Sequence, residues 1–301
     1  MDRLTAMQLF VRVVETGSFS AVAREMDMTQ PTVSKQLAAL ESRLKTRLLN
    51  RSTRQLSLTE AGSSYYESCK RILDEVREAE GNLGTLQGKV AGTLRLNTSI
   101  ALGQMYVAPI AIRFQKVHPE VEIDLQLQDR FVDLVEEGVD IAIRVGRLTD
   151  SSLVARRLGR ARRITVATPG YLKEHGTPRV PADLVNHNCI LYHYLSTGNE
   201  WIFEAPEGEI RVKVSGTFKA NNGDAIAQAV FADLGIAIAP EWIVHDALAS
   251  GKIRSILTDF APTPLDINAV FPSARHISTK VRSLVDFLQA QFDNYPALRT
   301  T

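Results

Sequence analysis

The chain has 301 residues, of which 45% are hydrophobic and 23% charged, an ordinary globular composition that excludes a disordered or fibrous protein. At roughly 100–200 residues per domain, this length predicts two or three domains. The net charge of +1 gives the whole chain no bias toward nucleic acid or membrane. Two cysteines are too few for a disulfide framework, and neither a signal peptide nor a run of about 18 apolar residues occurs, so we expect a cytoplasmic protein.

The average charge conceals a basic segment near the N-terminus. Between Arg24 and Arg54, seven basic residues outnumber three acidic ones, which gives this segment a net charge of +4. A basic patch on a small domain is typical of a phosphate-binding surface. On charge alone, a solvated charged face is an equal alternative.

The first part of the chain predicts three helices. Apolar residues spaced by three and four mark an amphipathic helix that ends at Gly17, and these residues are Leu4, Met7, Phe10, Val11 and Val14. Ser18 is a suitable N-cap for a second helix over 19–26. Thr29 caps a third helix, and Pro31 lies in its first turn, where the missing N–H costs little.

The third helix has a buried face and a polar face. One apolar stripe is formed by Val33, Leu37, Leu40 and Leu44. The polar residues at the start of the helix are Thr29, Gln30, Thr32, Ser34 and Lys35. An amide and an ammonium group can bind base edges in the major groove, and a helix N-terminus attracts phosphate. The pattern predicts a helix-turn-helix that binds double-stranded DNA, although structural bundles share the three-helix order.

The segment "LLNRSTRQLSLTEAG" predicts a β-hairpin beside this motif. Leu56 and Leu58 alternate with polar residues, and Arg51 and Arg54 lie near the expected tip. A basic hairpin of this kind provides a second contact to phosphates, so we include both arginines among the DNA-binding residues.

A long helix is expected after Thr59. Its apolar residues are spaced alternately by four and three, and they are Tyr65, Cys69, Ile72, Val76, Ala79, Leu83 and Leu86. This heptad spacing predicts a seam that pairs with a second copy of the chain and so presents two recognition helices to DNA. The alternative is an amphipathic helix that packs on its own domain. Cys69 and Cys189 are interpreted as small buried hydrophobic residues.

From Thr93 onward, expected strands and helices alternate. The first unit has strands at 93–98, 121–128 and 139–146, with a proline-containing helix at 101–119 and a short helix at 131–138. A second unit begins near 162 and includes a hairpin at 200–214, a strand at 216–221, a helix at 223–235 and a strand at 236–240. A strand at 265–272 and a helix at 278–292 follow. This order predicts an α/β fold with a largely parallel sheet.

Ligands of open α/β sheets bind at the carboxyl ends of strands. Thr98 and Ser99 lead directly into a helix, where hydroxyl and free N–H groups suit a carboxylate, with simple helix capping as the alternative. Other strand ends carry polar groups that could equally be capping or surface groups. The candidate effector-binding residues are Thr98, Ser99, Ile100, Asp129, Arg144, Arg147, His193, Asn221 and Asn222.

The segment "FVRVVETGSFSAVAREMDMTQPTVSKQLAALESRL", followed by "LNRSTRQLSLTEAG", resembles the DNA-binding segment of the LysR-type transcriptional regulators. The resemblance covers residues 4–62. It implies base and backbone contacts by Gln30, Pro31, Thr32, Ser34, Lys35, Arg51 and Arg54. Lys35 stands where the family commonly has arginine, and Lys45 and Thr46 replace a usual glycine-containing turn.

Residues 92–295 resemble the LysR-type effector domain, which is similar to periplasmic binding proteins. The resemblance implies two α/β lobes with an effector between them, and chain crossings near 163 and 267. The expected domains are a winged helix-turn-helix at 1–58, a linker and dimerisation helix with a hinge at 59–91, and an effector-binding domain at 92–301. Its lobe I spans about 92–163 and 268–301, and its lobe II about 164–267.

The sequence therefore predicts a DNA-binding transcriptional regulator controlled by a small anionic effector, without a metal or other cofactor and without a membrane partner. The resemblance further implies self-association as a dimer or tetramer and contact with RNA polymerase. A cytoplasmic solute-binding protein is the alternative. An enzyme is not expected, because no Gly-rich phosphate loop, metal-spaced His/Cys cluster or "GxSxG" motif occurs.

Overall fold

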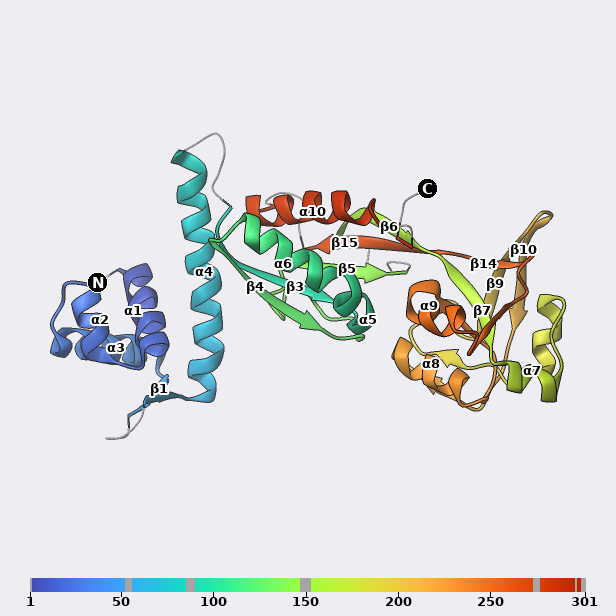
Figure 1. The fold of residues 1–301 in the computed structure, drawn as a ribbon. Helices are drawn as coiled ribbons and strands as arrows, with labels where there is room; N and C mark the ends of the chain where they lie inside the picture. The colour runs from blue at the N-terminus through green and yellow to red at the C-terminus, as the bar shows by residue number, and fades with distance from the viewer. Residues whose placement is uncertain are drawn as a thin grey trace. The chain divides into compact units, whose positions relative to one another are not determined.

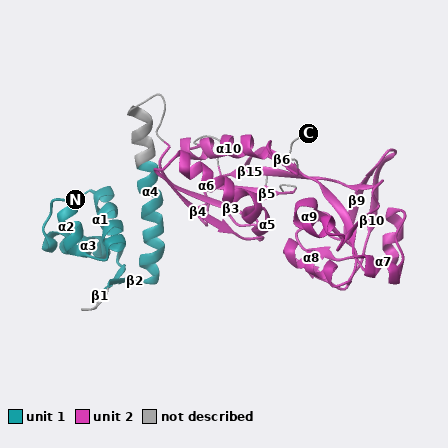
Figure 2. Cartoon of the chain, in the orientation of Figure 1, with its two compact units in different colours: residues 1–89 teal, residues 90–301 magenta. Residues whose placement is uncertain are grey.

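The computed structural model describes residues 2–51, 56–84, 90–146, 153–272, 277–295 and 297–298. The chain forms two compact units, Met1–Lys89 and Val90–Thr301 (Figure 2). Each unit has a hydrophobic core of its own.

The first unit contains the three predicted helices, the predicted hairpin and the long helix (Figure 1). Its elements are α1 (Arg3–Thr16), α2 (Phe19–Glu25), α3 (Gln30–Leu44), β1 (Leu49–Arg51), β2 (Leu56–Leu58) and α4 (Glu60–Gly84). The predicted caps are confirmed: Gly17 ends α1 with a φ of 63°, and the Ser18 side chain accepts a hydrogen bond from the Ala21 N–H. Thr29 caps α3 by accepting from the Thr32 N–H.

The core of this unit lies between α1, α3 and α4. The α3 stripe is buried at Val33, Leu37 and Leu40. From α4, Cys69 and Leu73 complete the same core. The start of α4 lies against the chain before β1, because a Cβ at Gly62 would be only 2.0 Å from the Leu48 carbonyl oxygen.

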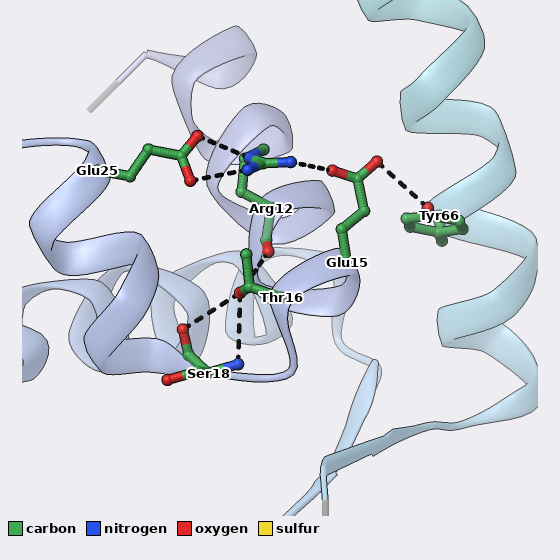
Figure 3. A network of polar contacts seen from close by, with 6 residues as sticks. All are labelled: Arg12, Glu15, Thr16, Ser18, Glu25 and Tyr66. Carbon is green, nitrogen blue, oxygen red and sulfur yellow. Dashed lines mark hydrogen bonds and ion pairs between the residues drawn. The ribbon is translucent and has the colours of Figure 1, made fainter. Parts of the chain in front are cut away.

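A polar network joins three helices of this unit (Figure 3). The Arg12 guanidinium donates to both carboxylate oxygens of Glu25 on α2, at 2.7 and 2.8 Å, and to Glu15 at 2.5 Å. The Tyr66 hydroxyl on α4 donates to Glu15 at 3.5 Å. The hydrogen bonds from Arg12 hold the pKa of Glu25 below its usual value.

A five-stranded sheet in the order β4-β3-β5-β15-β6 forms lobe I of the second unit. The strands are β3 (Gly92–Thr98), β4 (Val121–Leu127), β5 (Ile141–Val145), β6 (Val154–Ala161) and β15 (Leu265–Phe271). Only β4, β3 and β5 are parallel. The expectation of a largely parallel sheet is wrong for the other two, since β15 returns from the second lobe antiparallel to β5 and β6.

Two helical segments cover this sheet. The predicted helix at 101–119 is a continuous segment made of α5 (Ile100–Leu102), a π-helical stretch η1 (Gly103–Val107) and α6 (Ala108–Val117). The predicted C-terminal helix is α10 (Thr279–Phe292). The short helix expected at 131–138 is wrong: the Asp133 side chain accepts from the Val135 and Glu136 N–H groups and makes a turn.

Lobe II contains three small sheets. In the first, β7 (Arg163–Ala167) lies between β12 (Ala237–Pro240) and β13 (Arg254–Ile256). In the second, β8 (Leu191–Tyr192) is parallel to β11 (Lys219–Ala220). The third holds the predicted hairpin, β9 (Glu200–Ala205) with β10 (Gly208–Lys213), extended by β14 (Ala261–Pro262). Its helical segments are α7 (Pro169–His175), η2 (Pro181–Asn186), α8 (Gly223–Phe231) and α9 (Glu241–Ala249).

The chain passes between the lobes twice. The first passage separates β6 from β7 at Arg162, and the second separates β14 from β15 at Thr263 and Pro264. Near the C-terminus, Leu298 is fully buried against β6, and its carbonyl accepts from the Arg160 N–H at 3.1 Å. A Cβ at Gly159 would lie 2.2 Å from the same carbonyl oxygen, so glycine permits this close approach.

Candidate functional site

The first candidate site is the N-terminal part of α3. Thr29, Gln30, Pro31 and Lys35 are exposed there, while Thr32 and Ser34 are half-buried. The turn before α3 contains Asp27 with a φ of 55°, which reverses the chain between α2 and α3. The exposed side chains are therefore free of the core formed by the opposite face of the helix. The side chain of Arg51 and all of Arg54 lie outside the described residues.

The predicted seam on α4 is divided between two environments. Cys69 has no exposed surface and Tyr65 packs on the Phe10 ring at 5.6 Å, so both belong to the core of their own domain. For Cys69 this corrects the prediction of a contact with a second copy and favours the alternative of packing within the domain. Ile72 is 37% exposed and Val76 is half-buried. The side chains of Ala79 and Leu83 lie outside the described residues.

The second candidate site is a cavity of about 130 Å³ lined by both lobes of the second unit. Lobe I contributes Ser99, Asp129 and Arg144 among others, and lobe II contributes Arg163. Five aromatic side chains complete much of the wall: Phe131, Tyr192, Tyr194, Trp201 and Trp242. The wall is thus apolar and aromatic, with a few charged groups.

Arg144 is a buried cation in this wall. It lies on β5, is 8% exposed, and donates from Nη1 to the Asn97 Oδ1 at 2.5 Å. Its buried Nη2 has no hydrogen-bond partner within the described part of the chain. The guanidinium carbon is 5.7 Å from the centre of the Phe131 ring. Burial lowers the pKa of Arg144.

Arg163 is a second buried cation, at the start of β7. It is also 8% exposed, and its Nε donates to the Thr263 carbonyl at 2.7 Å. No ion pair to this guanidinium is present among the residues described. Burial lowers its pKa to about 10, so it remains charged at neutral pH. Both arginines thus carry positive charge into the cavity wall without a close ion pair among the described residues, although the Glu137 charge partly offsets the effect of burial on the pKa of Arg144.

The helix start predicted to bind an effector carboxylate is occupied by the protein itself. The Asp129 carboxylate accepts from the Ile100 N–H at 3.1 Å and from the Asn222 amide at 2.7 Å. Asn222 also caps α8 by accepting from the Ala225 N–H at 3.0 Å. Asp129 and Asn222 therefore form a hydrogen bond between the lobes. This corrects the placement of an effector carboxylate on the Ile100 N–H.

Other predicted residues are dispersed. Thr98 is fully buried within β3 and does not line the cavity, whereas Ser99 does. His193 donates its backbone N–H to Ala220 and packs on Tyr194, and neither His193 nor Asn221 lines the cavity. Arg147 lies outside the described residues.

Sequence reasoning missed Arg163, Trp201 and Trp242. Arg163 follows Arg162, which is exposed, and the local sequence does not show which of the two arginines is buried.

Within the described ranges, no group of three or more His, Cys, Asp or Glu side chains has the geometry to hold a metal ion. No described helix is long and apolar enough to span a bilayer.

Tyr192 has an environment that keeps its hydroxyl neutral. Burial, with the nearby Asp129 charge, raises its pKa to about 12. The phenol is therefore a hydrogen-bond donor across the physiological pH range.

Comparison with known proteins agrees with this architecture. Residues 4–63 match the family model of the bacterial regulatory helix-turn-helix protein, lysR family, and residues 87–293 match the LysR substrate binding domain. An HTH-type transcriptional regulator of Haemophilus influenzae is 35% identical over 94% of this chain and 99% of its own length. The transcriptional activator AaeR of Escherichia coli is 34% identical over 97% and 94%.

A solved structure has the same arrangement of domains along the chain. CrgA of Neisseria meningitidis, a LysR-type transcriptional regulator, is 33% identical, with a TM-score of 0.58 over 95% of this chain and 98% of that one. The chain belongs to the LysR family of DNA-binding transcriptional regulators, with a helix-turn-helix domain followed by an effector-binding domain.

Proposed function

We propose that this regulator responds to a small organic anion that binds in the cavity between the lobes. The observation that supports the proposal is the pair of buried arginines, Arg144 and Arg163, neither of which makes a close ion pair among the described residues, together with the unpartnered Nη2 of Arg144. A buried charge without a partner costs several kcal/mol, on the order of 3–5 when one member of a pair is removed. A bound anion removes this cost, so it stabilises the liganded state.

Binding acts through the lobes. The cavity wall comes from both lobes, and the lobes are joined by two chain passages and by the Asp129–Asn222 hydrogen bond. A ligand that contacts both lobes favours the lobe arrangement in which both sets of contacts form. In an oligomer, this shift changes the spacing of the helix-turn-helix pairs on DNA and, with it, the DNA bend or the contact with RNA polymerase.

The DNA contacts are assigned to the exposed start of α3 and to the arginines of the hairpin. Gln30 reads base edges, and Lys35 binds guanine or phosphate. Lys35→Ala, compared with wild type, should weaken binding to DNA and lower the dependence on salt by roughly one phosphate contact. An unchanged salt dependence contradicts the phosphate contact by Lys35. A regulator that binds chromosomal DNA works in the cytoplasm.

Self-association is assigned to the exposed face of α4. Ile72→Asp combined with Val76→Asp introduces charge into this face without touching the buried Cys69 and Leu73. Analytical ultracentrifugation should show smaller species than wild type at micromolar concentration. An unchanged oligomer contradicts this assignment.

The effector proposal is tested by thermal unfolding with a panel of small organic anions. An anion that raises the Tm of the wild type, but not of Arg144→Met, supports it. An equal rise in Tm in both proteins would mean that the anion's charged group binds away from Arg144, which contradicts the proposal.

A further inference from the structure

The size of the cavity restricts its ligand. The volume is about 130 Å³. On this measure roughly 10–15 Å³ is the least that admits one water molecule, so the space has room for a small organic molecule. A molecule with a single ring and one short substituent suits such a space.

The charges in the cavity wall restrict it further. Arg144 and Arg163 each add a positive charge, and Asp129 adds a negative one. Arg130 also lines the wall, but it is paired with Glu137 at 2.7 Å. The wall therefore carries a net charge of one positive unit. A ligand with a single negative charge balances this wall, whereas a dianion leaves an unbalanced charge in a partly buried site.

The remaining wall favours a ring. Aromatic residues make up 7% of the chain, yet five of them meet at this one cavity, including the only two tryptophans of the sequence, Trp201 and Trp242. Both tryptophans are buried, at 3% and 5% exposure. Aromatic side chains bind flat apolar groups through offset-stacked and edge-to-face contacts, and they lose little conformational entropy on binding.

The charged end and the aromatic wall are adjacent. Phe131 is 57% exposed, and its ring centre lies 5.7 Å from the guanidinium carbon of Arg144 and 5.9 Å from the ring centre of Tyr194 in the other lobe. A ring whose substituent reaches Arg144 therefore lies next to Phe131 and Tyr194. The neutral Tyr192 hydroxyl is a further donor in the same wall.

We propose that the effector is an aromatic monocarboxylate, with its carboxylate on the guanidinium of Arg144 and its ring among the tyrosine and tryptophan side chains. The inference rests on the proposed function and narrows its organic anion to one class. The unpartnered Nη2 of Arg144 supplies the donor that the carboxylate accepts from.

The test uses tryptophan fluorescence of the full-length wild type, because both tryptophans line the cavity. The protein is titrated with benzoate, with benzyl alcohol as the neutral ring, with acetate as the ringless monoanion and with succinate as the dianion. Benzoate should bind at least roughly tenfold more tightly than acetate, because its ring is buried. It should bind at least roughly tenfold more tightly than benzyl alcohol, because a hydrogen bond to a charged group is lost with the alcohol.

Variants locate the carboxylate. Arg144→Met should weaken benzoate binding roughly tenfold or more and leave benzyl alcohol binding unchanged. Arg156→Met is the control, since Arg156 is an exposed arginine of lobe I that is paired with Asp286 and does not line the cavity, and it should bind benzoate as wild type does. Arg144→Lys should restore part of the affinity. Calorimetric titration of the wild type provides the same comparison without any substitution.

Two outcomes overturn the inference in distinguishable ways. If succinate binds more tightly than benzoate and loses its affinity in Arg144→Met, the anionic effector stands and the aromatic class is rejected. If folded wild-type protein gives no saturable response to either anion, or if benzoate binds Arg144→Met as tightly as wild type, the anion-binding role of Arg144 is rejected as well.

Discussion

The hydrogen bond between Asp129 and Asn222 joins the two lobes, and its contribution can be isolated by substitution. Asn222→Ala removes two bonds, the cap on the Ala225 N–H and the bond to the Asp129 carboxylate. The cap contributes about 1 kcal/mol and the bond to a charged acceptor about 1.5–3 kcal/mol. The free energy of unfolding should therefore fall by about 2.5–4 kcal/mol, which lowers Tm by roughly 5–16 °C in a domain of this size.

Asn222→Ser separates the two contributions. Serine caps a helix about as well as asparagine, but its shorter side chain does not reach Asp129. The serine variant should lose about 1.5–3 kcal/mol, less than the alanine variant. Thermal unfolding by circular dichroism measures the stability, and the fluorescence of Trp201 and Trp242 reports on the lobe interface. A serine variant as stable as wild type would refute the bond between the lobes.

Three further substitutions test other features. Arg163→Met should leave Tm unchanged or raise it in the ligand-free protein, because replacing a buried charge with an apolar side chain is often neutral or stabilising, and a clear fall in Tm contradicts this. Gly62→Ala should destabilise the DNA-binding unit by about 1–3 kcal/mol, since its Cβ would meet the Leu48 carbonyl, and a Tm equal to wild type would show that the backbone adjusts freely. Glu25→Gln should be less stable than wild type at neutral pH. Because Arg12 lowers the folded-state pKa of Glu25, the extra stability of the wild type is fully present above about pH 4.3, the unfolded-state pKa, and is lost as pH falls through the folded-state pKa. Parallel curves of Tm against pH for the two proteins would contradict the ion pair.

The elements that the sequence predicted well are those with strong local signals. The apolar stripe of α3 and its Thr29 cap are contained within a few turns of chain, and both occur as predicted. The helix expected at 131–138 failed because the Asp133 side chain binds the backbone N–H groups that the helix needed. The helix α9 was missed because it begins directly after Pro240 with no side-chain cap to mark its start.

The cavity was harder to predict because its residues meet only through the chain passages between lobes. Arg144, Ser99 and Asp129 follow from strand ends and do line it. Arg163 and Trp242 come from distant segments, and no spacing in the sequence connects them to Arg144. Asp129 was expected to face a ligand, but its charge is already satisfied by the Ile100 N–H and Asn222.

The contact between Leu298 and β6 affects edge-to-edge association between copies of the chain. β6 is an edge strand of the five-stranded sheet, and a bare edge offers unpaired N–H and C=O groups to other chains. Leu298 covers part of this edge by accepting from the Arg160 N–H. A chain that lacks Leu298 leaves the Arg160 N–H without this acceptor, so removal of the segment around Leu298 should increase edge-to-edge association of the sheets.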